Sequence, residues 1–134
     1  MGNYRNFMLT TYFVAQGTAR ATEEKLEEDL RFFEKHLRLD KIYLEPFRYG
    51  VLADSEHISL CREVFRRHGI KVSGGLTTTI PTRDGDEPKQ RLFDTFCYND
   101  EKMTQRLREV SAILGSQFDD FIIDDFFFTN CTCE

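Results

Sequence analysis

The feature that most constrains the fold of this chain is a regular alternation of short apolar runs with longer amphipathic segments. Residues 7–14, 41–44, 70–73 and 118–128 are rich in aromatic and branched side chains, which is typical of buried β-strands. The segments between these runs repeat apolar residues at helical spacing. Strands that alternate with helices of crossover length pair in parallel through right-handed connections. We therefore predict an α/β fold with the order β-α-β-α-β-α-β.

Residues with known capping preferences lie at the ends of the three amphipathic segments. The expected N-caps are Thr22, either Asp54 or Ser55, and either Asn99 or Asp100. Gly69 and Gly115 are expected to end the second and third helices, because glycine readily adopts the backbone conformation that follows a helix. The inner stripe of the second helix is expected to comprise Ile58, Cys61, Val64 and Phe65.

Two parallel α/β folds compete, a doubly wound sheet of the flavodoxin type and the N-terminal half of a (β/α)8 TIM barrel. A doubly wound nucleotide-binding sheet places a glycine-rich phosphate loop after its first strand, but residues 15–19 contain a single glycine and no lysine. We therefore predict that residues 1–134 form one partial TIM-barrel domain with strands in sequential order. Tyr12, Leu44 and Ile123 are expected to face the barrel interior. Two open sheet edges would favour a homodimer.

Acidic side chains lie near the end of the fourth predicted strand, where the active sites of parallel α/β folds are found. Asp124 and Asp125 follow three bulky apolar residues, and carboxylates are costly to bury in such surroundings. Burial of this kind suits a carboxyl group to acid/base catalysis. The alternative is that both acids only cap the next loop. Adjacent strand residues point to opposite faces, so one of the two is expected to face the barrel axis.

Three further candidate site residues lie in or after the first two strands. Glu45 and Arg48 are expected to form a charge-assisted pair, which either contacts substrate or is a plain salt bridge at the barrel rim. Tyr12 would either stack on or hydrogen-bond a sugar, or belong to the core. A long loop over residues 77–98 is expected to lie above these side chains.

Cys131 and Cys133 are separated by one residue, a spacing that fits half of a zinc site. Cys61 is assigned to a helix, and the three histidines are assigned to helix surfaces or packing positions. We therefore expect no complete ligand set, and no metal, within the chain.

Charge and composition exclude several classes of protein. The net charge of −5 lies entirely in residues 71–134, and an acidic surface argues against nucleic-acid binding. The chain has no apolar run long enough to cross a membrane, and its first residues do not resemble a signal peptide. Four cysteines are too few for a disulfide framework, so we predict a cytoplasmic protein with free thiols.

Four stretches together resemble the N-terminal half of a TIM-barrel glycoside hydrolase: residues 7–14, KIYLEPFR (41–48), GIKVSGGLTTT (69–79) and FDDFIIDDFFFTNCTC (118–133). The resemblance implies hydrolysis of O-glycosidic bonds in a carbohydrate substrate, without a cofactor. It implies that Asp124 or Asp125 is a catalytic carboxylate and that Glu45 and Arg48 bind sugar. Glycosidases of this kind use two carboxylates, and the second would come from a later strand. A non-catalytic, self-associating half-barrel and a small-molecule-binding flavodoxin-like domain are the alternative hypotheses.

Overall fold

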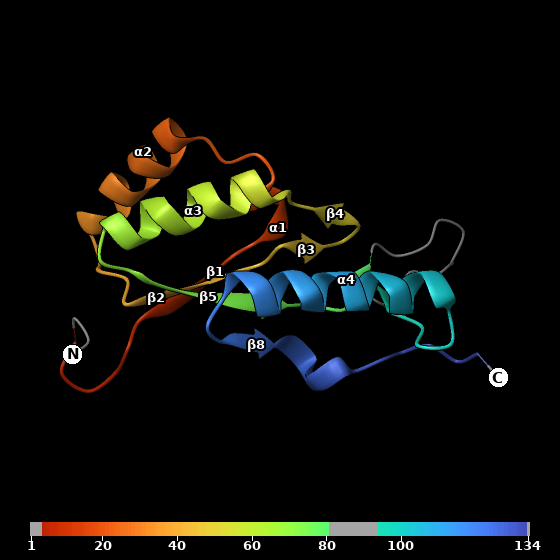
Figure 1. The fold of residues 1–134 in the computed structure, drawn as a ribbon. Coiled ribbons are helices and arrows are strands. Elements are labelled where there is room, and N and C mark those ends of the chain that lie inside the picture. Colours follow the sequence, from red (N-terminus) through yellow and green to blue (C-terminus); the bar gives the residue numbers. More distant parts are fainter. Residues whose placement is uncertain (1–3, 81–93, 134) are drawn as a thin grey trace, which may run out of the picture.

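The computed structural model describes residues 4–80 and 94–133, which are arranged around one parallel sheet (Figure 1). Its strands are β1 (Thr10–Phe13), β2 (Lys41–Leu44), β5 (Lys71–Leu76) and β8 (Phe121–Ile123). The three long helices between them are α2 (Glu23–Glu34), α3 (Ser55–Arg67) and α4 (Glu101–Gln117). The predicted alternation of strands and helices in an α/β fold is therefore confirmed.

The four strands of the sheet pair in parallel and in chain order, β1-β2-β5-β8. Tyr12 of β1 lies opposite Tyr43 of β2, which in turn lies opposite Ser73 of β5. Gly75 of β5 lies opposite Ile122 of β8. The sequential order confirms the predicted pairing, because consecutive β/α units of a barrel are neighbours in the sheet. The sheet is consistent with part of a TIM-like barrel.

Side-chain caps begin all three long helices, as the sequence predicts. Thr22, Asp54 and Asp100 each accept a hydrogen bond from the backbone N–H three residues later, at 3.3, 2.8 and 2.9 Å. Gly69 follows α3 with φ of 72°, a conformation that few other residues adopt. The prediction for Gly115 is wrong, because α4 continues two residues beyond it.

The helices cover one face of the sheet and form the apolar core with it. The predicted inner stripe of α3 is confirmed, since all four of its side chains are buried in this core. Leu44 of β2 lies in the same core with no exposed surface, and Ile123 of β8 packs against it. The expectation that Leu44 and Ile123 face a barrel interior is therefore wrong. Side chains alternate along a strand, and these two point toward the helices.

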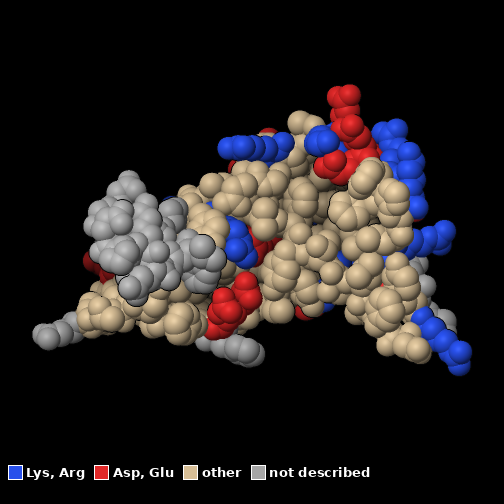
Figure 2. Space-filling model, turned by 180° about the vertical axis from the view of Figure 1, so that it is seen from behind, with Lys and Arg blue, Asp and Glu red and all other residues tan. Residues whose placement is uncertain are grey.

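Tyr12 lies on the opposite face of the sheet, as predicted. The Tyr12 and Tyr43 ring centroids are 5.4 Å apart, and a Cβ atom added to Gly75 would lie 3.5 Å from the Tyr12 ring. Seen from behind, charged side chains gather over the α2 and α3 end of the molecule (Figure 2). Near the middle of the same view, a few acidic side chains lie below a basic side chain, and most of the surface around them is uncharged (Figure 2).

The fourth strand is shorter than predicted, because it ends at Ile123. The 3-10 turn η1 (Asp124–Phe127) follows at once. Asp125 and Phe127 have φ of 54° and 59°, values that no β-strand residue adopts. Asp124 and Asp125 are therefore turn residues, and strand alternation does not decide where their side chains point.

Besides η1, five short elements among the described residues were not predicted. One is the single helical turn α1 (Ala15–Thr18), directly after β1 and Val14. The others form two hairpins, β3 (Phe47–Arg48) with β4 (Val51–Leu52), and β6 (Thr79–Ile80) with β7 (Asp94–Thr95). The first hairpin turns at Tyr49 and Gly50, whose φ values of 50° and 80° suit a tight two-residue turn.

None of the described helices is both long and apolar enough to span a membrane.

Candidate functional site

Glu45 and Arg48 form a two-pronged ion pair at the carboxyl end of β2. Arg48 Nε donates to Glu45 Oε2 at 2.7 Å, and Arg48 Nη2 donates to Glu45 Oε1 at 2.7 Å. The β3–β4 hairpin folds back directly after Glu45, so it carries Arg48 on β3 within reach of that carboxylate. The predicted pair is therefore present in the structure.

Thr77, directly after β5, completes the surroundings of Glu45. Its hydroxyl donates to Glu45 Oε1 at 2.6 Å and accepts from Arg48 Nη2 at 3.3 Å. The Glu45 residue has no exposed surface. A carboxylate is buried at such a position only when charged or polar partners replace water. Arg48 and Thr77 supply those partners, and hydrogen bonding to Glu45 raises the pKa of the Arg48 guanidinium.

A glycine in β5 makes room for this buried group. A Cβ atom added to Gly75 would lie 3.0 Å from Glu45 Cγ, which is closer than side chains normally approach. Burial of Glu45 therefore depends on the absence of a side chain on the neighbouring strand.

Arg48 also links the buried pair to Asp124. Its Nη2 lies 3.7 Å from Asp124 Oδ2, and the Asp124 side chain is 37% exposed against 19% for Arg48. We call Glu45, Arg48, Thr77 and Asp124 the rim cluster. Asp125 is exposed, and its backbone carbonyl accepts a hydrogen bond from Phe128 N–H. Of the two predicted catalytic residues, the structure thus brings only Asp124 into contact with Arg48.

Tyr12 lies beside the rim cluster on the open face of the sheet. Burial, followed by the negative charges of Asp124 and Glu45, raises the pKa of the Tyr12 phenol above its ordinary value. The phenol therefore keeps its proton at neutral pH. It can donate a hydrogen bond to a bound group beside Asp124.

The structure places the predicted site residues unequally. Tyr12, Arg48 and Asp124 have exposed surface at the rim, whereas Glu45 reaches the rim only through Arg48. Sequence reasoning did not single out Thr77 as a partner of Glu45, because the third strand was predicted to end at Ser73 and β5 in fact extends to Leu76. Most of the predicted long loop over residues 77–98 lies outside the described residues, and its two ends form the β6–β7 hairpin.

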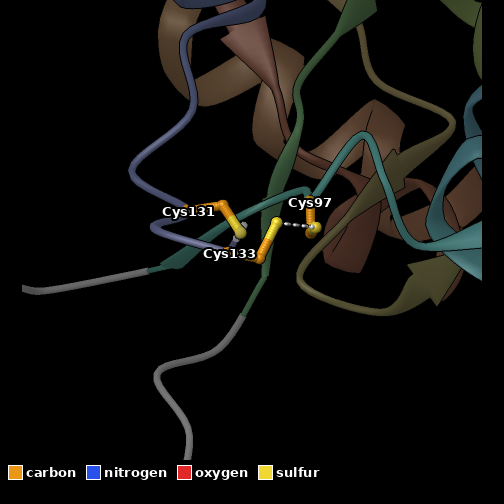
Figure 3. A group of neighbouring side chains, drawn as sticks. All are labelled: Cys97, Cys131 and Cys133. Carbon is orange, nitrogen blue, oxygen red and sulfur yellow. Dashed lines mark hydrogen bonds between the residues drawn. The ribbon is translucent and has the colours of Figure 1, made fainter.

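A second group of side chains gathers where the segments after β7 and after η1 meet (Figure 3). The Sγ atoms of Cys97, Cys131 and Cys133 all lie within 4.8 Å of one another. The Cys97 and Cys133 sulfurs are 3.3 Å apart, as the dashed line in Figure 3 marks. We call these residues the thiol cluster. Sequence spacing reveals the Cys131–Cys133 pair but not Cys97, which is 36 residues from Cys133 and joins the pair only in the fold.

Charged side chains at the carboxyl ends of parallel strands are the usual arrangement of active sites in β/α enzymes. The chain belongs to the family described as "Probable glycosyl hydrolase, catalytic domain", whose model matches residues 1–134.

An uncharacterised protein of Saccharolobus solfataricus is 30% identical to this chain over 130 residues, which are 97% of the chain. The chain spans 22% of the length of that relative. No solved structure matches the chain.

Proposed function

We propose that residues 1–134 are the N-terminal half of a TIM-barrel glycoside hydrolase, with Asp124 as one of its catalytic carboxylates. The observation that carries this proposal is the contact between Asp124 and Arg48 at the carboxyl rim of the sheet. Only the anionic form of a carboxyl group makes an ion pair, and a nucleophile or general base reacts in that form. We therefore assign Asp124 the nucleophile or base role and not the acid role.

The neighbouring side chains would orient the sugar. Arg48 and Tyr12 carry N–H and O–H donors beside Asp124, and sugar hydroxyl groups accept hydrogen bonds from such donors. Glu45 is fully buried, so in this proposal it positions Arg48 and does not contact substrate. Hydrolysis by two carboxylates needs no cofactor.

The second catalytic carboxylate would come from a later part of a longer protein. Retaining enzymes hold the two carboxyl groups about 5–5.5 Å apart, and inverting enzymes hold them about 6.5–9.5 Å apart. The small share of the archaeal relative that this chain covers supports a longer polypeptide with room for that residue.

The test uses the full-length natural protein that contains this chain, assayed on aryl glycosides. Asp124→Asn should lower kcat by a factor of roughly 10²–10⁴, the usual size of a carboxylate's contribution. Asp119→Asn is the matched control, because Asp119 is exposed and precedes β8 at its opposite end. Asp125→Asn should cost far less than Asp124→Asn.

The anomeric configuration of the product separates the two roles of Asp124. If Asp124 is the nucleophile, the wild type should release sugar with retained configuration, and azide should restore turnover of Asp124→Ala through a glycosyl azide of inverted configuration; if Asp124 is the general base, the wild-type product should be inverted. An Asp124→Asn protein with unchanged kcat would remove Asp124 from the mechanism, and a larger loss in Asp125→Asn would transfer the role to Asp125.

A further inference from the structure

We propose that the thiol cluster binds one Zn²⁺ ion through the sulfur atoms of Cys97, Cys131 and Cys133. Zinc binds cysteine thiolates at about 2.3 Å in tetrahedral geometry, which places two bound sulfurs about 3.8 Å apart. The three sulfurs of the cluster lie within 4.8 Å of one another, and the Cys97 and Cys133 sulfurs are 3.3 Å apart. Small side-chain rotations would bring all three to the spacing that one zinc ion requires.

The backbone that carries the thiols is fixed by hydrogen bonds between the two segments. Asn130 Oδ1 accepts from Thr95 N–H at 3.1 Å and from the Thr95 hydroxyl at 2.7 Å. Asn130 N–H donates back to Thr95 Oγ1 at 2.7 Å, and the Thr129 hydroxyl donates to the Phe96 carbonyl at 2.8 Å. The residues before Cys97 and Cys131 are thus held together without a metal. Preorganised ligands bind metal more tightly, because less chain entropy is lost on binding.

A polar side chain also contacts the thiol cluster. Asn99 Nδ2 lies 3.4 Å from Cys133 Sγ, where it can donate a hydrogen bond to the sulfur. Donors around the ligand atoms orient them and offset the negative charge of bound thiolates. Structural zinc is bound by four protein ligands, so a side chain from another part of a longer protein would supply the fourth donor.

Two other uses of three neighbouring thiols fit the observations less well. A disulfide between Cys97 and Cys133 would leave Cys131 without a reason to lie beside them. A [4Fe–4S] cluster binds each cysteine through a different iron atom, which holds the sulfurs further apart than a single ion does, and a [2Fe–2S] cluster needs four protein ligands shared between two irons. Sulfurs this close favour one ion shared by all three.

The proposed zinc would fasten the turn that carries Asp124. The Tyr98 hydroxyl already donates to the Phe127 carbonyl at 2.7 Å, so η1 contacts the segment that carries Cys97. A metal bound by Cys97 and by the two cysteines after η1 would hold the segment after β7 and the segment after η1 together. Its role is structural, and it goes beyond the proposed hydrolysis because it takes no part in the reaction.

The experiment measures metal content of the full-length natural protein, purified with reductant, incubated with Zn²⁺ and desalted. The Cys133→Ser and Cys97→Ser proteins should each hold one zinc ion fewer per chain than the wild type. Thr132→Ala, which changes the residue between two ligands, and Cys61→Ala, which removes the buried thiol of α3, should keep the wild-type zinc content. With Co²⁺ in place of zinc, the wild type should show thiolate-to-cobalt charge-transfer absorption.

A conservative variant keeps the test decisive if a serine variant does not fold. Cys133→His retains a zinc ligand, so it should keep the ion while its cobalt charge-transfer band weakens. Equal zinc content in wild type and folded serine variants would overturn the proposal. A Cys97–Cys133 disulfide in protein alkylated directly from cells, before any reductant is added, would overturn it too. Neither readout uses glycoside turnover, so failure here is distinct from failure of the proposed function.

Discussion

At the scale of single residues, the most informative group is the buried carboxylate of Glu45. A charge without solvent contact is tolerated only because Arg48 donates hydrogen bonds to both oxygen atoms of the Glu45 carboxylate and Thr77 donates to one of them. Gly75 leaves the space that the group occupies. The neighbouring strand and the hairpin after β2 therefore both serve to hold one arginine at the rim.

Removal of Arg48 should destabilise the protein strongly. Arg48→Met leaves the Glu45 carboxylate buried without its charged partner, and the loss of one member of a buried pair costs roughly 3–5 kcal/mol. Urea unfolding followed by circular dichroism measures this cost. The double variant Glu45→Leu/Arg48→Met, which removes both charges, should recover much of the lost stability.

A matched surface variant gives the scale for that measurement. Lys25 forms exposed ion pairs with Glu28 and Asp29 on α2, so Lys25→Met should cost far less than Arg48→Met. Similar costs for the two variants would mean that Arg48 is not what allows Glu45 to be buried.

Asp124 and Asp125 show that the role of a residue was harder to predict from the sequence than its place at the rim of the sheet. Parallel strands end on the same side of a sheet, so the sequence predicted that Glu45, Asp124 and Asp125 would collect at one rim and that Arg48 would pair with Glu45. The structure shows the Glu45–Arg48 pair and brings Asp124, but not Asp125, against Arg48. Strand alternation could not rank the two acids, because the chain leaves the strand at Asp124. The positive φ of Asp125 depends on the packing of the turn, and no local motif in the sequence signals it.

At the scale of elements, long periodic segments were predicted well and short ones were not. The inner stripe of α3 was predicted fully, since thirteen residues repeat one pattern. The β3–β4 and β6–β7 hairpins have strands of two residues each, too short to show a period. The aromatic run at residues 126–128 looked like a strand because apolar composition does not distinguish a strand from an apolar turn.

The contact between α2 and α3 should make stability depend on pH. His68, at the end of α3, lies between Glu34 and Glu27 of α2, with ring nitrogens 2.8 and 3.0 Å from their carboxylates. Hydrogen bonding to Glu34, and then to Glu27, raises the pKa of His68 above 6.5. The folded state therefore holds a proton that the unfolded chain has already released. This stabilisation is complete below about pH 6.5 and disappears as pH rises through the folded-state pKa.

Unfolding free energies from about pH 5.5 to about pH 8.5 test this sign. The wild type should lose stability over this interval relative to His68→Gln, whose side chain does not titrate. Glu34→Gln should reduce the dependence, whereas Lys35→Gln changes an adjacent charge outside the pair and should preserve it. A difference between wild type and His68→Gln that grows with pH would contradict the assignment.

At the scale of the whole molecule, the sheet has two open edges, β1 and β8. Large apolar side chains near these edges are exposed, among them Phe7 and Met8 before β1 and Phe128 after η1, at 58%, 56% and 57%. A closed barrel has no strand edges, and its second half would cover these side chains. The exposed groups thus support the interpretation of the chain as part of a barrel.

A polypeptide that consists of residues 1–134 alone should therefore self-associate. Each large apolar side chain left in water forgoes about 1.5–3 kcal/mol of burial, against a typical net stability of roughly 5–15 kcal/mol. Association through the open edges would recover part of that free energy.

Sedimentation velocity at several concentrations should show species larger than a monomer. The variant Phe7→Ser/Met8→Ser, altered beside β1, should associate less, whereas Phe32→Ser, altered at an exposed position on α2, should associate as the wild type does. A defined dimer with cooperative unfolding would favour the self-associating half-barrel, because missing barrel strands predict heterogeneous aggregates. A cooperative monomer at every concentration would show that the edges need no partner, and the half-barrel interpretation would then fail.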